Sequence, residues 1–176
     1  MQVLDEAPVL ESEIDSLGHM NVRFYIARVD RANAVLLQQL GIKIPADQKS
    51  VLRRADTYSR FHREQFSGSQ LQVHGGLLDI SPAQIRCYYE IRNPDKDQVA
   101  ATFITVSQLI QPASQTTVPF SLAGVTESEQ YKVELPDYGS PRSLTLNPPK
   151  VDVALTELQA RITSDPAPGM MSGSRS

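Results

Sequence analysis

The side chains best suited to chemistry in this sequence gather in residues 15–25. They are a carboxylate, a glycine, a histidine and an amide: Asp15, Gly18, His19 and Asn21. They come just before a segment that we expect to form a buried helix, and the first four backbone N–H groups of a helix lack partners within it. Those groups lie at the positive end of the helix dipole, where they can stabilise negative charge that develops on a carbonyl oxygen. Since a neighbouring carboxylate can activate water or attack the carbonyl itself, the pattern indicates acyl transfer.

Other catalytic patterns are missing from the sequence. It has no G-x-x-x-x-G-K-[ST] phosphate loop, no G-x-G-x-x-G dinucleotide turn and no G-x-S-x-G nucleophile elbow. The three histidines lack the H-E-x-x-H spacing of a zinc site. The single cysteine, Cys87, cannot complete a P-C-x-x-C zinc motif, and its place among strand residues is typical of a buried structural thiol. We expect neither a metal nor a redox cofactor.

Length and composition predict one globular domain with an appendage. The chain has 176 residues, 40% of them hydrophobic, which suffices for a single core. Its formal net charge of -3 leaves no basic surplus for nucleic acid. Residues 98–126 carry no charge, but glutamines and prolines interrupt them, so we expect no membrane span. With one cysteine and an acidic N-terminal segment that lacks the features of a secretory signal, we expect a soluble cytoplasmic protein.

Hydrophobic periodicity places the motif between a strand and a long helix. Residues 8–15 predict a short strand. Residues 21–40 predict a helix that is apolar around most of its circumference, and therefore largely buried. Gly41 stands where a left-handed C-cap belongs. Strand-like alternation and short turns then predict four antiparallel strands, at 51–66, 70–80, 83–92 and 98–110, and so an α+β fold.

The C-terminal part of the chain differs in composition, because eight of the twelve prolines follow residue 111. We divide the chain into a domain over 1–126, an extension over 127–163 and a disordered tail over 164–176. Within the extension, residues 151–162 place four apolar side chains on one face, which predicts a short amphipathic helix. We expect this helix to pack on the main body or on a partner chain.

The segment Asp15-Ser-Leu-Gly-His-Met-Asn21 resembles the D-x-x-G-H-[VM]-N signature of hot-dog-fold acyl-CoA thioesterases of the 4-hydroxybenzoyl-CoA thioesterase type. Tyr25 fits the same pattern, and residues 58–68 resemble the second strand of that family with its glycine turn. The resemblance spans residues 8–112. It implies an antiparallel sheet wrapped around one long helix. It also implies hydrolysis of an acyl-CoA, or of an acyl carrier protein thioester, by a homodimer or homotetramer.

The resemblance assigns roles to individual residues. Asp15 would be the catalytic carboxylate, as general base or as nucleophile, while His19 and Asn21 would position water or the acyl group. Backbone N–H groups of residues 22–25 would hold the oxyanion, and Glu64 would complete the pocket from a neighbouring subunit. The other residues expected to contact substrate are Gly18, Val22, Arg23, Phe24, Tyr25, Arg60 and Arg63, the last two gripping the phosphates of coenzyme A.

These residues also have plainer interpretations. Asp15 can accept turn or helix N–H groups as a cap, and Asn21 can be the helix N-cap. His19 can be a structural histidine and Tyr25 a core residue. The arginines near residue 60 can form a solvated strand face.

Three positions depart from the family pattern and leave other functions open. Glu13 stands where a second aspartate is common, Val22 where a polar residue is frequent, and Ser69 where an aspartate often follows the turn glycine. One alternative is therefore a non-catalytic module that binds acyl-CoA or serves assembly. Another is a hydratase or dehydratase that acts on the acyl chain.

Overall fold

The computed structural model describes residues 1–42, 50–122, 125 and 128–135. All of them belong to the first of two units of the chain, Met1–Leu135; the second unit is Pro136–Ser176. The helix predicted over 151–162 and the tail predicted over 164–176 lie outside the described residues.

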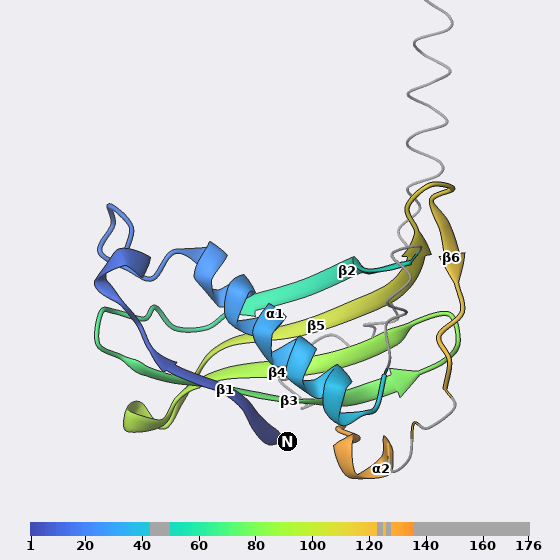
Figure 1. Ribbon diagram of the computed structural model, residues 1–176. Coiled ribbons are helices and arrows are strands. Elements are labelled where there is room, and N and C mark those ends of the chain that lie inside the picture. Colours follow the sequence, from blue (N-terminus) through green and yellow to red (C-terminus); the bar gives the residue numbers. More distant parts are fainter. Residues whose placement is uncertain (43–49, 123–124, 126–127, 136–176) are drawn as a thin grey trace, which may run out of the picture. The chain divides into compact units, whose positions relative to one another are not determined.

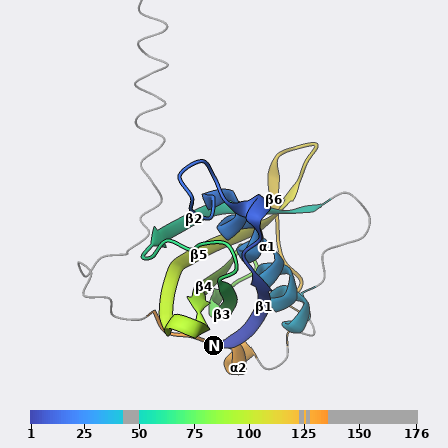
Figure 2. The ribbon, with the colours of Figure 1, turned by 90° about the vertical axis from the view of Figure 1, so that its left-hand side faces the viewer.

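In the described part of the chain, an antiparallel sheet of six strands curves around the helix α1, Val22–Gln39 (Figures 1 and 2). Five strands lie in the spatial order β1-β3-β4-β5-β2, and β6 pairs with β5. Their bounds are β1 Gln2–Pro8, β2 Val51–Phe61, β3 Gln70–Ile80, β4 Ile85–Asn93, β5 Gln98–Gln111 and β6 Thr116–Val118. Two short 3-10 helices, η1 Glu11–Glu13 and η2 Pro94–Lys96, and a four-residue helix, α2 Ser128–Tyr131, complete the elements.

The helix α1 buries one side against the sheet. Val29, Ala32 and Leu36 on this side have no exposed surface, and they join a single core with apolar residues of β3, β4 and β5. Val22 and Ile26, on the other side, are 50% and 38% exposed. The expectation that the helix is largely buried is therefore wrong for the side that carries Val22 and Ile26, because the sheet covers only one side.

Both ends of α1 are fixed by local signals that the sequence predicts. The Asn21 side chain caps the N-terminus by accepting a hydrogen bond from the N–H of Arg23. At the other end Gly41 has a φ of 71°, which confirms the left-handed C-cap. The N–H groups of Gly41 and Ile42 then donate to the carbonyls of Gln38 and Leu37, the paired bonds of a Schellman motif.

The first strand lies earlier than predicted. Residues 2–8 form β1, while residues 9–15 continue into η1 and a turn. Pro8 has no N–H to offer a ladder, and the chain then tightens when Glu13 donates its N–H to the carbonyl of Leu10. The prediction of a strand over 8–15 is thus wrong.

The strand β2 forms an open edge of the sheet. It pairs along its whole length with β5, and no described residue pairs with its other edge. Most of its side chains are exposed, among them Val51, Tyr58 and Phe61. The predicted strand over 51–66 ends at Phe61, and the segment that follows it, residues 62–65, runs toward the N-terminus of α1, where the N–H of Met20 donates to the carbonyl of Gln65.

Candidate active site

A tight turn holds Asp15 in front of α1. The N–H of Asp15 donates to the carbonyl of His19 at 2.9 Å, and the N–H of Gly18 donates to the carbonyl of Asp15 at 3.0 Å. Gly18 has a φ of 82°, a backbone conformation that residues with a Cβ rarely adopt. The Asp15 carboxylate accepts the N–H of Leu17 through Oδ1 at 2.9 Å. One carboxylate oxygen therefore closes the turn, as the plainer interpretation expects, and Oδ2 forms no hydrogen bond with a described residue.

Asp15 lines a cavity of about 570 Å³ between this turn, the start of α1 and the end of β2. The cavity is lined by Asp15, His19, Met20, Val22, Tyr25, Phe61, His62, Arg63 and Glu64. A second cavity, of about 720 Å³, lies along the other half of α1 and touches β2 at Leu52 and Arg54. It contains none of the predicted site residues, so the cavity at Asp15 is the candidate active site.

His19 pairs with Glu64 at one side of this cavity. The Nε2 atom of His19 lies 3.2 Å from Glu64 Oε2, and the two side chains are 33% and 65% exposed. The edge of the imidazole also meets the ring of Phe66, with centroids 5.6 Å apart. Glu64 was expected to reach the pocket from a neighbouring subunit, but it contacts His19 within its own chain.

The N-terminus of α1 has fewer free amides than residues 22–25 led us to expect. Asn21 occupies two of them: its Oδ1 accepts the N–H of Arg23 at 3.1 Å, and its backbone carbonyl accepts the N–H of Phe24 at 3.0 Å. No acceptor for the N–H of Val22 is found within the described ranges. Val22 also lines the cavity that contains Asp15. Asp15 and the first residue of α1, whose N–H is unused among the described residues, therefore line the same cavity.

Tyr25 is both a core residue and part of the cavity wall. It is 3% exposed, and its ring meets the edge of Phe61 with centroids 5.4 Å apart. Burial raises the pKa of Tyr25 to about 12, with Glu64 contributing in the same direction. Its hydroxyl therefore stays protonated at neutral pH, and it can act there only as a neutral hydrogen-bonding group.

The structure separates the remaining predicted residues into two groups. Arg63 lines the cavity. Gly18, Asn21, Arg23, Phe24 and Arg60 do not line it. Arg23 lies instead over the ring of Phe24, 4.5 Å from its centroid. Asn21 and Gly18 contribute to the site by fixing the backbone of the helix N-terminus and of the turn, not by contacting the cavity.

Sequence reasoning missed three residues of the cavity wall: Met20, Phe61 and His62. Met20 lies inside the signature, and the other two directly precede Arg63 and Glu64. Their position at the end of a predicted strand was the available signal. The Nε2 atom of His62 lies 3.1 Å from Thr102 Oγ1, and burial together with Arg60 and Arg63 lowers the pKa of His62. The lowered pKa favours the neutral imidazole of His62 at pH 7.

Three further features of the described residues concern metal binding, the single cysteine and membrane-spanning helices. Among the described residues, no group of three or more histidine, cysteine, aspartate or glutamate side chains can hold a metal ion. Cys87 is buried, and burial raises the pKa of its thiol to about 12, so it is inert as a nucleophile. No described helix has the length and apolar character needed to cross a membrane.

Comparison with known proteins identifies the family. The model of the thioesterase-like superfamily matches residues 9–130, and the chain therefore belongs to that superfamily. A search of curated proteins found no match.

Solved structures support the same fold. A 1,4-dihydroxy-2-naphthoyl-CoA thioesterase from Synechocystis is 17% identical, with a TM-score of 0.62 over 78% of this chain and 97% of its own. A DHNA-CoA thioesterase from Staphylococcus aureus is 18% identical, with a TM-score of 0.59 over 90% and 91%. A further S. aureus protein, solved in complex with CoA, is 13% identical, with a TM-score of 0.65 over 81% and 94%. At these identities the likeness shows the fold, and it confirms the predicted hot-dog architecture.

Proposed function

We propose that the protein is an acyl-CoA thioesterase that hydrolyses its substrate to the free acid and coenzyme A. The observation that carries this proposal is that one cavity is lined by Asp15 and by Val22, whose N–H has no acceptor among the described residues. Membership of the thioesterase-like superfamily supports it, as do relatives of the same fold that act on or bind CoA compounds. No metal or redox cofactor is part of the proposal.

The chemistry follows from these two groups. In the general-base route, Asp15 takes a proton from water as the water oxygen attacks the thioester carbonyl carbon. The N–H of Val22 donates to the oxyanion that forms. When the intermediate collapses, the C–S bond breaks and the thiolate of CoA takes the proton from Asp15. In the nucleophilic route, the Asp15 carboxylate attacks the carbonyl carbon, the C–S bond breaks and CoA leaves as a thiolate. Water then hydrolyses the mixed anhydride, which restores the Asp15 carboxylate, and the proton released goes to the thiolate.

The other predicted residues have supporting roles. Asn21 fixes the first turn of α1 and so sets the direction of the Val22 N–H. His19, paired with Glu64, stands beside Asp15 in the cavity wall, where it can hold water or the carbonyl oxygen. Apolar walls from Met20, Val22 and Phe61 favour the acyl group over water at the reacting carbon.

The direct test is release of free thiol from short, long and aromatic acyl-CoAs by the purified full-length chain. We expect turnover of at least one class, with free acid and CoA as the products. Tight binding without turnover of any acyl-CoA would favour the non-catalytic module. Conversion of an enoyl-CoA or a hydroxyacyl-CoA without thiol release would favour the hydratase. If only acyl carrier protein thioesters are hydrolysed, the proposed acyl-CoA substrate is wrong and the proposed thioester hydrolysis is correct.

Arg63 is the cavity residue best placed to hold a phosphate of coenzyme A, and Arg60 lies close enough to influence His62. An exposed charge contact contributes about 1 kcal/mol, so Arg63→Ala should raise KM roughly five-fold and leave kcat within two-fold. Arg60→Ala should have a smaller effect in the same direction. Arg53→Ala, near the start of β2 and away from the cavity, is the control and should leave KM unchanged. Steady-state kinetics with one acyl-CoA measure all three, and an unchanged KM in Arg63→Ala contradicts the assignment.

We also propose that the protein is at least a homodimer, in which the open edges of β2 meet. An exposed eleven-residue edge with Val51, Tyr58 and Phe61 uncovered would be prone to pair with another chain. Two-fold symmetric dimers are the commonest homo-oligomers, and in such a dimer the same edge of both chains can pair. Light scattering after size-exclusion chromatography should give the mass of two or four chains of 19.5 kDa. Backbone amides of β2 should then be protected from hydrogen exchange, and a monomer with a freely exchanging outer edge would exclude this assembly.

A further inference from the structure

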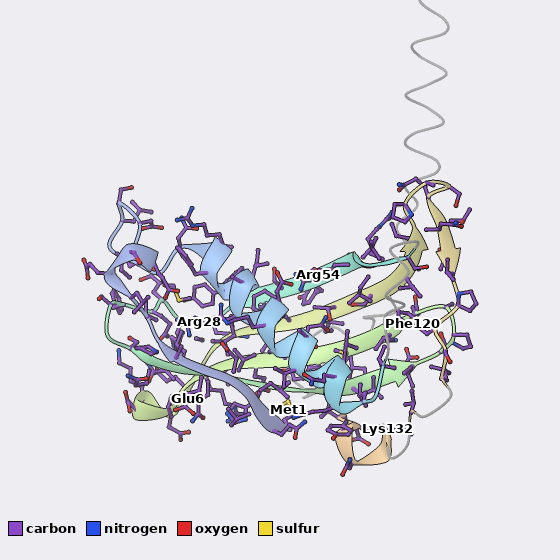
Figure 3. The ribbon with its side chains drawn as sticks, viewed as in Figure 1. Met1, Glu6, Arg28, Arg54, Phe120 and Lys132 are labelled. Atoms are coloured by element: carbon purple, nitrogen blue, oxygen red, sulfur yellow. The ribbon has the colours of Figure 1, made fainter. Side chains whose placement is uncertain are left out.

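Arg28 is a charged side chain that the proposed reaction does not use and that the fold nevertheless buries. It stands on the second turn of α1 with 1% of its surface exposed. Figure 3 shows it between α1 and β1. Removing a guanidinium from water is costly unless the charge is paired and its N–H groups are hydrogen-bonded. The contacts of Arg28 must therefore offset that cost.

All of these contacts go to one short segment of chain, residues 7–13. The Nη1 atom donates to the carbonyl of Ala7 at 2.8 Å, and Nη2 donates to the carbonyl of Pro8 at 2.8 Å. Nη2 also donates to Glu13 Oε2 at 3.0 Å, and this same oxygen accepts the N–H of Leu10 at 3.1 Å. Arg28 Nε is buried and has no acceptor among the described residues. The guanidinium thus clamps the end of β1 and the helix η1 onto α1.

Glu13 connects this clamp to the candidate active site. Its backbone carbonyl accepts the N–H of Asn21, the N-cap of α1, at 2.9 Å. The next residue, Ile14, bridges to Met20, and the N–H of Asp15 donates to His19. Glu13 is therefore held by α1 through both its backbone and its side chain, two residues before the carboxylate. The position of Asp15 relative to the Val22 N–H follows from where Glu13 is held.

We propose that Arg28, acting through Glu13, is a positioning residue that sets the distance between the Asp15 carboxylate and the N-terminus of α1. The inference rests on the proposed thioesterase function. Residues 9–20 are also anchored at both ends, since Val9 exchanges backbone hydrogen bonds with Ser69 and Gly68 and the N–H of Met20 donates to Gln65. Loss of the Arg28 contacts removes the side-chain attachment of Glu13 to α1, and the turn between these two anchors can then shift relative to the helix. A displacement of about 1 Å at a reacting group costs about a hundred-fold in rate, whereas substrate binding by distant arginines is unaffected.

The chain offers a matched control one turn further along α1. Arg31 forms a similar ion pair with Asp5 on β1, with Nη2–Oδ2 at 3.0 Å and Nε–Oδ1 at 3.1 Å. This pair also joins α1 to the first strand, and Arg31 forms no hydrogen bond or ion pair with the described residues 9–20. Its charge is felt by Glu13, and a lysine keeps that charge. The Arg31 side chain is 51% exposed. Arg31→Lys therefore perturbs a helix-to-strand ion pair without perturbing the turn.

The test compares Arg28→Lys, Arg31→Lys and the double variant Arg28→Met/Glu13→Leu in the full chain. Arg28→Lys keeps the positive charge but loses the planar guanidinium that donates to Ala7, Pro8 and Glu13 at once. We expect kcat to fall about ten- to a hundred-fold and KM to stay within two-fold of the wild-type value. Arg31→Lys should keep the kcat of the wild type. The double variant removes both buried charges and should recover thermal stability toward the wild-type value, because an apolar pair can replace a buried ion pair. Its kcat should remain low.

The outcomes separate positioning from simple stabilisation. If kcat returns together with thermal stability in the double variant, Arg28 is only structural and the proposal is overturned. Hydrogen exchange gives a readout that does not need turnover: in Arg28→Lys the amides of Asp15, Gly18 and Asn21 should exchange at least ten-fold faster, while those in the middle of α1 do not change. Unchanged exchange at these three amides also overturns it. If the wild-type protein hydrolyses no thioester, the proposed function fails, and the exchange result still decides whether Arg28 holds the turn.

Discussion

Asp15→Asn is expected to lower kcat for acyl-CoA hydrolysis about 10³-fold, within the range of roughly 10² to 10⁴ that a general base contributes. The amide is the same size as the carboxylate, and its Oδ1 can still accept the N–H of Leu17, so the turn should persist. The amide cannot take a proton from water, and it is a poor nucleophile. Thiol release at saturating substrate measures the effect, with thermal unfolding to show that the variant is folded.

The control for this substitution is Asp79→Asn, which makes the same chemical change on β3 at a partly exposed ion pair with Arg86, outside the cavity. It should leave kcat within two-fold and change stability by less than about 1 kcal/mol. Full activity in a folded Asp15→Asn variant would mean that Asp15 serves only as a turn cap. The catalytic carboxylate would then have to be sought elsewhere in the cavity, beginning with Glu64.

Val22→Pro should lower kcat about 10²- to 10³-fold, the usual cost of removing one oxyanion donor. Proline deletes the N–H of Val22 and nothing else that the helix needs, since the first helical position has no intrahelical acceptor for it. The preceding residue must be extended, and Asn21 already is, with a φ of -65° and a ψ of 138°. The Val22 side chain is half exposed, so little packing is lost.

Val22→Ala is the matched control for the proline variant. It removes most of the same side chain but keeps the N–H, and kcat should remain within about two-fold of the wild type. Parallel steady-state kinetics and circular dichroism of the two variants measure the contribution of the amide alone. A folded Val22→Pro variant with wild-type kcat would show that the oxyanion is bound by another group.

The elements that the sequence predicts well are those whose signals are local. The helix expected over 21–40 is observed over 22–39, because its periodicity and both of its caps lie within its own residues. The strands expected over 70–80 and 98–110 are observed with the same starts. In each case short-range backbone chemistry and a regular apolar pattern agree with one another.

The first strand was misplaced because its signal is not local. Of the β1 residues only Leu4 is buried, so the alternation that marks a strand is weak there. What makes residues 2–8 a strand is their pairing with β3, almost seventy residues away along the chain. In contrast, Val9 and Ile14 lie outside any strand and pack on the core. Their apolar side chains gave residues 8–15 a pattern that resembles a strand.

By itself the sequence determined that Asp15, a glycine turn and a helix N-terminus stand together, since all three lie within a few residues of one another. Tertiary structure decided which side chains from the end of β2 close the cavity, and that Glu64 meets His19 within one chain. The physical reason is that these contacts join residues far apart along the chain. They depend on how closely the curved sheet brings the end of β2 to the first turn of α1. No local pattern of residues encodes the distance between these two elements.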